Sequence, residues 1–200
     1  MIAEYWLGEL ESALRAPELS ACDAAETRGP EAEAAYQAAL CLGYCRILGA
    51  ELPEGGACLS VRQARAAGDV LVKNIATWVK ETQDLPARWD SAPVGTETDL
   101  CVDILQARMD AWAVSIAVGG RARRVRRAVA RFDRALREVL ELLSTLAGSQ
   151  FVTNWRRAIK GRIPWWLGDA LDNESRRVAA EAEAAWQELR ARGKIPAPRR

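Results

Sequence analysis

The sequence predicts an all-α protein with six or seven helices in a bundle-like or orthogonal packing and no sheet. Apolar residues recur at intervals of three and four along most of the 200-residue chain, and no segment sustains the apolar-polar alternation of a strand. Half of the residues are hydrophobic and 28% are charged, which excludes a disordered chain and allows a sizeable core. We therefore expect residues 1–200 to form a single helical domain in which 194–200 are a frayed tail.

The N-terminal part is expected to contain two helices. The first covers about residues 2–16, because its apolar residues form one stripe that stops before Pro17. The second begins at Pro30, whose fixed backbone suits a first helical turn, and stops near Gly49, a residue type common at helix ends. Residues 51–59, with one proline and two glycines, are expected to form a loop.

A third helix is expected to start after Ser60. Gln63 stands three residues later, so the two side chains have the spacing of a capping box. The apolar stripe of this helix contains Gly68, which would allow a neighbouring helix to approach closely. Residues 84–96 contain two prolines and a glycine and are expected to form a second loop.

The remaining chain predicts two long helices, a short segment and a last helix. The long helices cover about residues 97–118 and 121–147, because two consecutive glycines separate them. A short segment follows over 151–160. The last helix is expected over about 169–192, with Gly193 at its end.

The formal net charge of +1 conceals an uneven distribution. Residues 1–60 contain three basic and ten acidic side chains, a net charge of −7, and residues 61–120 contain six and eight, a net charge of −2. Residues 121–200 contain nineteen basic and nine acidic side chains, a net charge of +10. The chain has no histidine, which excludes the many hydrolytic mechanisms that use histidine as a general base.

Five cysteines and no export signal predict reduced thiols and a cytoplasmic location. No apolar run is long enough for a membrane span, and acidic residues interrupt the first residues where a signal peptide would lie. Four of the cysteines could form a four-thiolate zinc site, but they lack the two closely spaced cysteine pairs that are typical of such sites. Buried thiols without metal are therefore the preferred interpretation. The four candidate ligands are Cys22, Cys41, Cys45 and Cys58.

The most distinctive feature is the amphipathic pattern of the fifth expected helix. Its apolar residues fall on one side of a helical wheel, and its arginines occupy the other side with few acidic residues at neutralising positions. We expect this cationic face, together with the preceding residue Arg121, to bind an anion. The arginines on it are Arg123, Arg124, Arg126, Arg127, Arg131, Arg134 and Arg137.

Three sources of compensating negative charge are possible. Phosphates of a nucleic acid could lie on the face, the acidic residues 1–60 could pair with it within the chain or in a second copy, or an acidic partner or anionic membrane could cover it. We prefer the nucleic acid.

Residues 154–166 support that preference, because these thirteen residues contain four cations, three tryptophans and no acidic residue. Single-stranded nucleic acids bind to such surfaces by base stacking and phosphate neutralisation. For the tryptophans themselves, the slightly preferred interpretation is that they are core or hinge anchors beside solvated cations. The candidate residues are Trp155, Arg156, Arg157, Lys160, Arg162, Trp165 and Trp166.

A stripe of carboxylates on the fourth expected helix suggests a different function. Asp99, Asp103 and Asp110 lie close together on a helical wheel, and carboxylates one turn apart can bind Mg²⁺. However, no convincing second acidic pair and no phosphate-binding glycine loop accompany them, so a solvent-facing or salt-bridged stripe is the preferred interpretation.

The sequence therefore predicts a non-enzymatic accessory subunit without a cofactor or metal. It would bind RNA or single-stranded DNA through the basic residues 121–200, and its acidic residues 1–60 would contact a protein partner or a second copy. One alternative is a scaffold module whose oppositely charged ends associate head to tail. Another is an all-helical Mg²⁺-dependent hydrolase that uses the aspartate stripe.

Overall fold

The structure is a computed structural model that describes residues 2–15, 28–52, 58–119 and 123–192. These residues form nine α-helices and two short 3₁₀ helices, with no strand among them. The all-α class is confirmed, and the expected number of six or seven helices is too low. The elements are α1 (Ile2–Arg15), α2 (Arg28–Leu48), α3 (Val61–Gln83), α4 (Leu85–Ser91), α5 (Glu97–Ala117), α6 (Arg123–Glu138), α7 (Leu140–Leu143), η1 (Ser144–Leu146), α8 (Gln150–Ala158), η2 (Trp165–Leu167) and α9 (Asp169–Ala191).

Two local differences account for the extra helices. The expected loop 84–96 contains the short helix α4, which has Pro86 in its first turn, where a missing backbone N–H costs no intrahelical bond. The expected helix 121–147 is interrupted at Val139, whose φ of −116° and ψ of 17° lie outside the α-helical region. The apolar stripe continues across this break, so the sequence pattern carries no sign of it.

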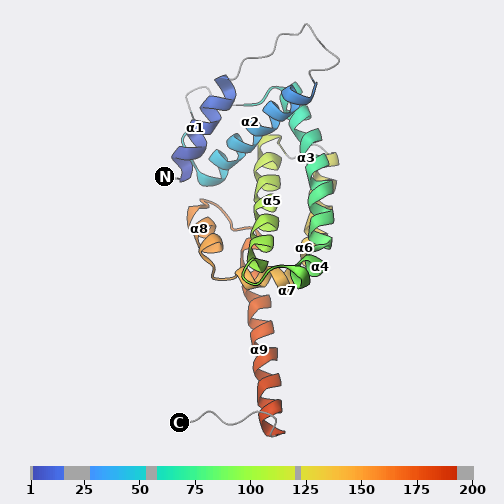
Figure 1. Ribbon diagram of the computed structural model, residues 1–200. Coiled ribbons are helices and arrows are strands. Elements are labelled where there is room, and N and C mark those ends of the chain that lie inside the picture. Colours follow the sequence, from blue (N-terminus) through green and yellow to red (C-terminus); the bar gives the residue numbers. More distant parts are fainter. Residues whose placement is uncertain (1, 16–27, 53–57, 120–122, 193–200) are drawn as a thin grey trace.

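Helix α5 lies at the centre of the fold (Figure 1), where it contacts α2, α3 and α6. Helix α1 packs on α2, and α6 packs mainly on α3. The N-terminal helices gather at one end of the molecule, while α9 extends away from the opposite end. As a result, α6 and α1 belong to different parts of the surface.

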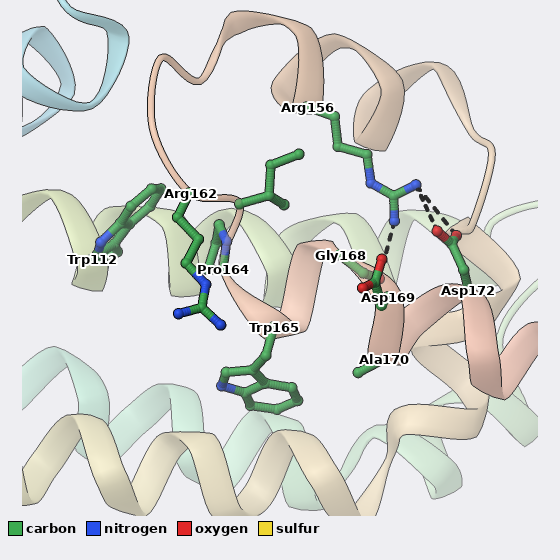
Figure 2. Close-up of a pocket in the computed structure, with 10 residues that line it drawn as sticks. Trp112, Arg156, Arg162, Pro164, Trp165, Gly168, Asp169, Ala170 and Asp172 are labelled. Atoms are coloured by element: carbon green, nitrogen blue, oxygen red, sulfur yellow. Dashed lines mark hydrogen bonds and ion pairs between the residues drawn. The ribbon is translucent and has the colours of Figure 1, made fainter.

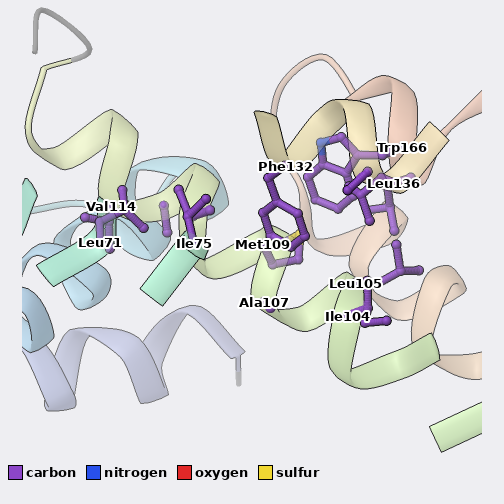
Figure 3. Close-up of a cluster of buried hydrophobic side chains, with 14 of the residues drawn as sticks. Leu71, Ile75, Ile104, Leu105, Ala107, Met109, Val114, Phe132, Leu136 and Trp166 are labelled. Carbon is purple, nitrogen blue, oxygen red and sulfur yellow. The ribbon is translucent and has the colours of Figure 1, made fainter. Parts of the chain in front are cut away.

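The core joins α3, α5 and α6 with the segment around η2. Leu71 and Ile75 of α3 face Val114 of α5 at one end of the cluster (Figure 3), and Phe132 of α6 lies near Trp166 at the other end. Trp166 and Phe132 are 1% and 0% exposed, so two of the largest side chains of the basic half are core residues.

Glycines permit two close helix crossings. A Cβ atom at Gly43 of α2 would lie 1.9 Å from the carbonyl oxygen of Ala113 in α5, a distance that no side chain can occupy. A Cβ atom at Gly68 of α3 would lie 3.3 Å from Cγ2 of Val125 in α6, and the close approach expected at Gly68 is confirmed.

The predicted helix boundaries around the first loop are also confirmed. The side chain of Ser60 accepts a hydrogen bond from the backbone N–H of Gln63 at 3.2 Å, and the side chain of Gln63 accepts one from the backbone N–H of Ser60 at 2.9 Å. Helix α2 ends at Leu48, and Gly49 follows with a φ of 63°.

A buried ion pair fixes the orientation of α6 on α5. Nε of Arg108 donates a hydrogen bond to Asp133 at 2.8 Å, and its Nη2 donates to the other carboxylate oxygen at 3.3 Å. The guanidinium also lies 5.1 Å from the centre of the Trp166 ring. The side chain of Asp133 therefore points into the fold, where its negative charge is paired with Arg108.

Helix α9 has little support from the rest of the chain. Leu171 in its first turn is its only buried residue, and residues 179–192 are exposed. Arg177 forms ion pairs with Glu174 and Glu181, and Arg192 pairs with Glu188, so the exposed turns are stabilised by contacts along the helix itself. None of the described helices combines the length and apolar character needed to cross a bilayer.

Candidate nucleic-acid interface

Helix α6 presents its arginines to solvent. Val125, Phe132, Ala135 and Leu136 are buried on the side that packs against α3 and α5. The opposite side carries seven exposed arginines, which we call the α6 arginine surface. They are Arg123, Arg124, Arg126, Arg127, Arg131, Arg134 and Arg137.

Few protein groups compensate the charge of this surface. Arg124 pairs with Asp69 of α3 at 3.2 Å, but both side chains are more than half exposed, so water screens the pair strongly. The guanidinium of Arg137 lies 4.8 Å from the centre of the Trp165 ring, in a cation–π contact. Within the described residues, the other five arginines have no ion pair. Only water or a bound anion can therefore reduce the repulsion between them.

The described acidic residues of the N-terminal part do not cover the α6 arginine surface. Helix α1, which carries Glu4 and Glu9, packs on α2, while the arginines of α6 remain exposed. Intrachain pairing, one of the three sources of negative charge considered above, therefore finds no support in the described part of residues 1–60. The acidic residues at 16–27 and Glu54, like the candidate residue Arg121, lie outside the described residues.

The tryptophans of residues 154–166 have three different environments. Trp166 is buried in the core, so it cannot stack on a base in this fold, and we exclude it from the candidate interface. Trp155 is half-buried and stacks on Tyr44 with ring centres 5.5 Å apart, and Trp6 stacks on Tyr44 from α1 at 4.2 Å. Only Trp165, half-buried beneath Arg137, lies next to the α6 arginine surface.

The cations of this segment are also divided. The side chain of Arg156 donates to the carbonyl oxygens of Leu167 and Gly168 and pairs with Asp172 at 3.0 Å, which fastens α8 to the start of α9. Lys160 is exposed, and its backbone N–H donates to Ile47 at the end of α2.

The two other cations of the segment, Arg157 and Arg162, are exposed. Figure 1 shows α8 and α6 on different sides of α5, so Arg157 of α8 does not extend the α6 arginine surface. Arg162 belongs to the link that follows α8. Its side chain lines the same cleft as Trp165.

A cleft of about 780 Å³ lies between α5 and the start of α9. Figure 2 shows Trp112 of α5 and Trp165 of η2 on its walls, with the side chain of Arg162 between them. Asp169 lies on the opposite side of the cleft, beside the Arg156–Asp172 pair. The cleft thus combines two indole rings with one unpaired cation and one unpaired carboxylate among the described residues.

The aspartate stripe of α5 does not gather at one site. Asp99 and Asp103 are exposed, whereas Asp110 is partly buried and accepts hydrogen bonds from Tyr44 and Gln106. The described residues contain no cluster of three or more acidic or cysteine side chains that could hold a metal ion. Cys41 and Cys45 are buried free thiols and Cys58 is exposed, while Cys22 lies outside the described residues.

The partly buried carboxylate of Asp110 makes the stability of the fold depend on pH. Burial raises its pKa above the ordinary value of 3.8, and the hydrogen bonds from Tyr44 and Gln106 offset this only in part. The folded chain therefore holds the proton of Asp110 more tightly than the unfolded chain does. As a result, the contribution of Asp110 to the free energy of unfolding is fully present below about pH 4 and is lost as the pH rises through the raised pKa.

We predict that Asp110→Asn removes this contribution. Denaturant unfolding at pH 4, 5.5 and 7 should show that the variant gains stability relative to the native chain as the pH increases. Asp103→Asn, at an exposed position of the same helix, is the matched control and should follow the native chain. A stability difference between Asp110→Asn and the native chain that does not change with pH would contradict the prediction.

Comparisons with known proteins do not place the chain in a family. No family model matches it, and neither the curated proteins nor the solved structures contain a significant match.

Proposed function

We propose that this protein is a non-enzymatic accessory subunit that binds RNA or single-stranded DNA through the α6 arginine surface. The observation that supports this proposal most is the exposure of five arginines without an acidic partner among the described residues. These are Arg123, Arg126, Arg127, Arg131 and Arg134.

Phosphates are the anions that fit this surface best. The planar guanidinium group binds phosphate oxygens with two parallel hydrogen bonds, and the 16 residues of α6 extend over about 24 Å, enough to follow several phosphates. Binding would also reduce the repulsion between neighbouring arginines, because each phosphate neutralises a guanidinium charge, and it would release the cations condensed on the nucleic acid.

The surroundings of Trp165 favour a single strand over a duplex. Trp165 lies at the end of the arginine surface and beside the cleft, where an unpaired base could reach an indole ring. Bases in a duplex are stacked on each other and are not available for this contact. Phosphate contacts alone would not distinguish the two forms, so this preference depends on Trp165.

Binding to labelled oligonucleotides over a range of salt concentrations tests the proposal. We expect single-stranded RNA and DNA 20-mers to bind at 50 mM NaCl, with a slope of log K against log salt of roughly −3 to −4, as contact with four to six phosphates implies. A blunt duplex of the same length should bind more weakly. If no strand binds at 50 mM NaCl, the proposed function is wrong.

A second candidate function, protein association, is favoured by α9. This helix extends from the fold with Trp186 and Leu189 on its surface, 50% and 38% exposed and less than one turn apart. If no strand binds to the protein, an interaction module built around α9 becomes the better proposal. In either case we propose a reducing, cytoplasmic location, in keeping with the free thiols of Cys41, Cys45 and Cys101.

A further inference from the structure

We propose that the cleft beside Trp165 receives one unstacked base of the bound strand and prefers guanine. This inference rests on the proposed function, because the phosphates of the strand would lie on the α6 arginine surface. It adds a base-binding site to that surface and predicts a sequence preference.

The position of the cleft supports this inference. Arg137 is the last arginine of α6 and lies three residues after Arg134, about 4.5 Å farther along the helix axis. Its guanidinium is 4.8 Å from the centre of the Trp165 ring, and the same ring lines the cleft. A strand that follows the arginines therefore reaches the mouth of the cleft at Trp165.

The side chains of the cleft match the parts of a nucleotide. Trp165 and Trp112 provide flat apolar surfaces for a base. Arg162 is exposed and has no ion pair among the described residues, so it can bind the phosphate of the same nucleotide. The cleft volume of about 780 Å³ is within the range of small-molecule sites and is ample for one base.

Asp169 provides the basis for discrimination. Arg156 is already paired with Asp172, so Asp169 is the carboxylate of the cleft that remains without an ion pair in the described chain. An ionised carboxylate only accepts hydrogen bonds, and guanine presents two adjacent donors, its N1–H and its amino group. Uracil presents one N–H between two carbonyl oxygens that a carboxylate repels. Asp169 should therefore favour guanine over uracil.

The test compares a 12-mer of uridines with the same strand carrying one central guanosine, by fluorescence anisotropy at 100 mM NaCl. The native protein is expected to bind the guanosine strand about tenfold more tightly, the order of magnitude of one stacked and hydrogen-bonded base. Asp169→Ala should remove this preference, because the guanosine strand loses its acceptor and the uridine strand is freed from the repelling carboxylate. Trp165→Leu should weaken binding to both strands, Trp165→Phe should restore most of it, and Trp186→Leu on α9 is the matched control without effect.

The outcomes separate this inference from the proposed function. If both strands bind equally and Trp165→Leu has no effect, the cleft does not hold a base, although binding on α6 stands. If neither strand binds, the proposed function and this inference both fail. Tighter binding of free guanosine 5′-monophosphate than of the guanosine strand would identify the cleft as a nucleotide site and would overturn the assignment to a strand.

Discussion

Replacing Gly43 with alanine is expected to destabilise the fold by about 3 kcal/mol or more. The added Cβ atom would lie 1.9 Å from the carbonyl oxygen of Ala113 and 2.3 Å from its carbon, both in the backbone of α5. No side-chain rotation can relieve this overlap, so α2 and α5 must separate, and the core between them loses its close packing. Thermal unfolding should show a decrease in Tm of roughly 10 °C.

Gly8→Ala is the matched control for this prediction. Gly8 lies within α1, and an added Cβ atom there would meet no heavy atom within 4 Å. The helix preference of alanine should leave the stability unchanged or raise it by up to ~1 kcal/mol. Equal melting temperatures for Gly43→Ala and the native protein would show that α2 and α5 are not in contact at this crossing.

Reversing the charge of three arginines on α6 is expected to weaken single-strand binding by about 10³-fold or more. The variant is Arg127→Glu, Arg131→Glu and Arg134→Glu, at exposed positions without a described ion pair, so the fold should persist. Each change removes a charge-assisted hydrogen bond to phosphate, a contribution of about 1.5 kcal/mol, and adds repulsion. Anisotropy with a labelled 20-mer at 100 mM NaCl measures the loss.

The matched control makes the same change of net charge on a different surface. Arg176 and Arg190 are exposed on α9 and Arg192 is exposed directly after its last residue; replacing all three with glutamate changes the charge of the protein equally. Since α9 extends away from α6, we expect at most a severalfold loss of affinity through the long-range field. Similar losses in the two variants would mean that net charge alone, and not the α6 arginine surface, attracts the strand.

Features determined by short stretches of sequence could be predicted. The all-α class, the capping box at Ser60, the end of α2 before Gly49 and the amphipathic pattern of α6 depend on neighbours within a few turns. The exposure of the α6 arginines was the expected result of that pattern, because the apolar side had to face the core.

Features that depend on distant contacts could not be predicted. Asp110 is 66 residues from Tyr44 in the sequence, and Asp133 is 25 residues from Arg108, so no local pattern shows that either carboxylate is turned inward. The burial of Trp166 has the same origin, since its neighbours are Trp112 and Arg108 of α5 and Phe132 of α6.

The cleft also combines distant parts of the chain, with Trp112 on α5 and Trp165 in η2. Its best local signal is the combination of tryptophans and cations in residues 154–166, a segment that contains Arg162 and Trp165, both of which line the cleft. The same signal also selected Trp166, which is a core residue, because composition does not reveal which side of a turn is buried.

The salt dependence of binding tests most directly whether the α6 arginines contact phosphates. Arg127→Gln, Arg131→Gln and Arg134→Gln together should make the slope of log K against log salt less negative by about 2, since each lost phosphate contact on a single strand accounts for about 0.7. The corresponding glutamine variant of Arg176, Arg190 and Arg192 should keep the native slope. A native slope in the α6 variant would show that these arginines bind no phosphate and would contradict the proposed function.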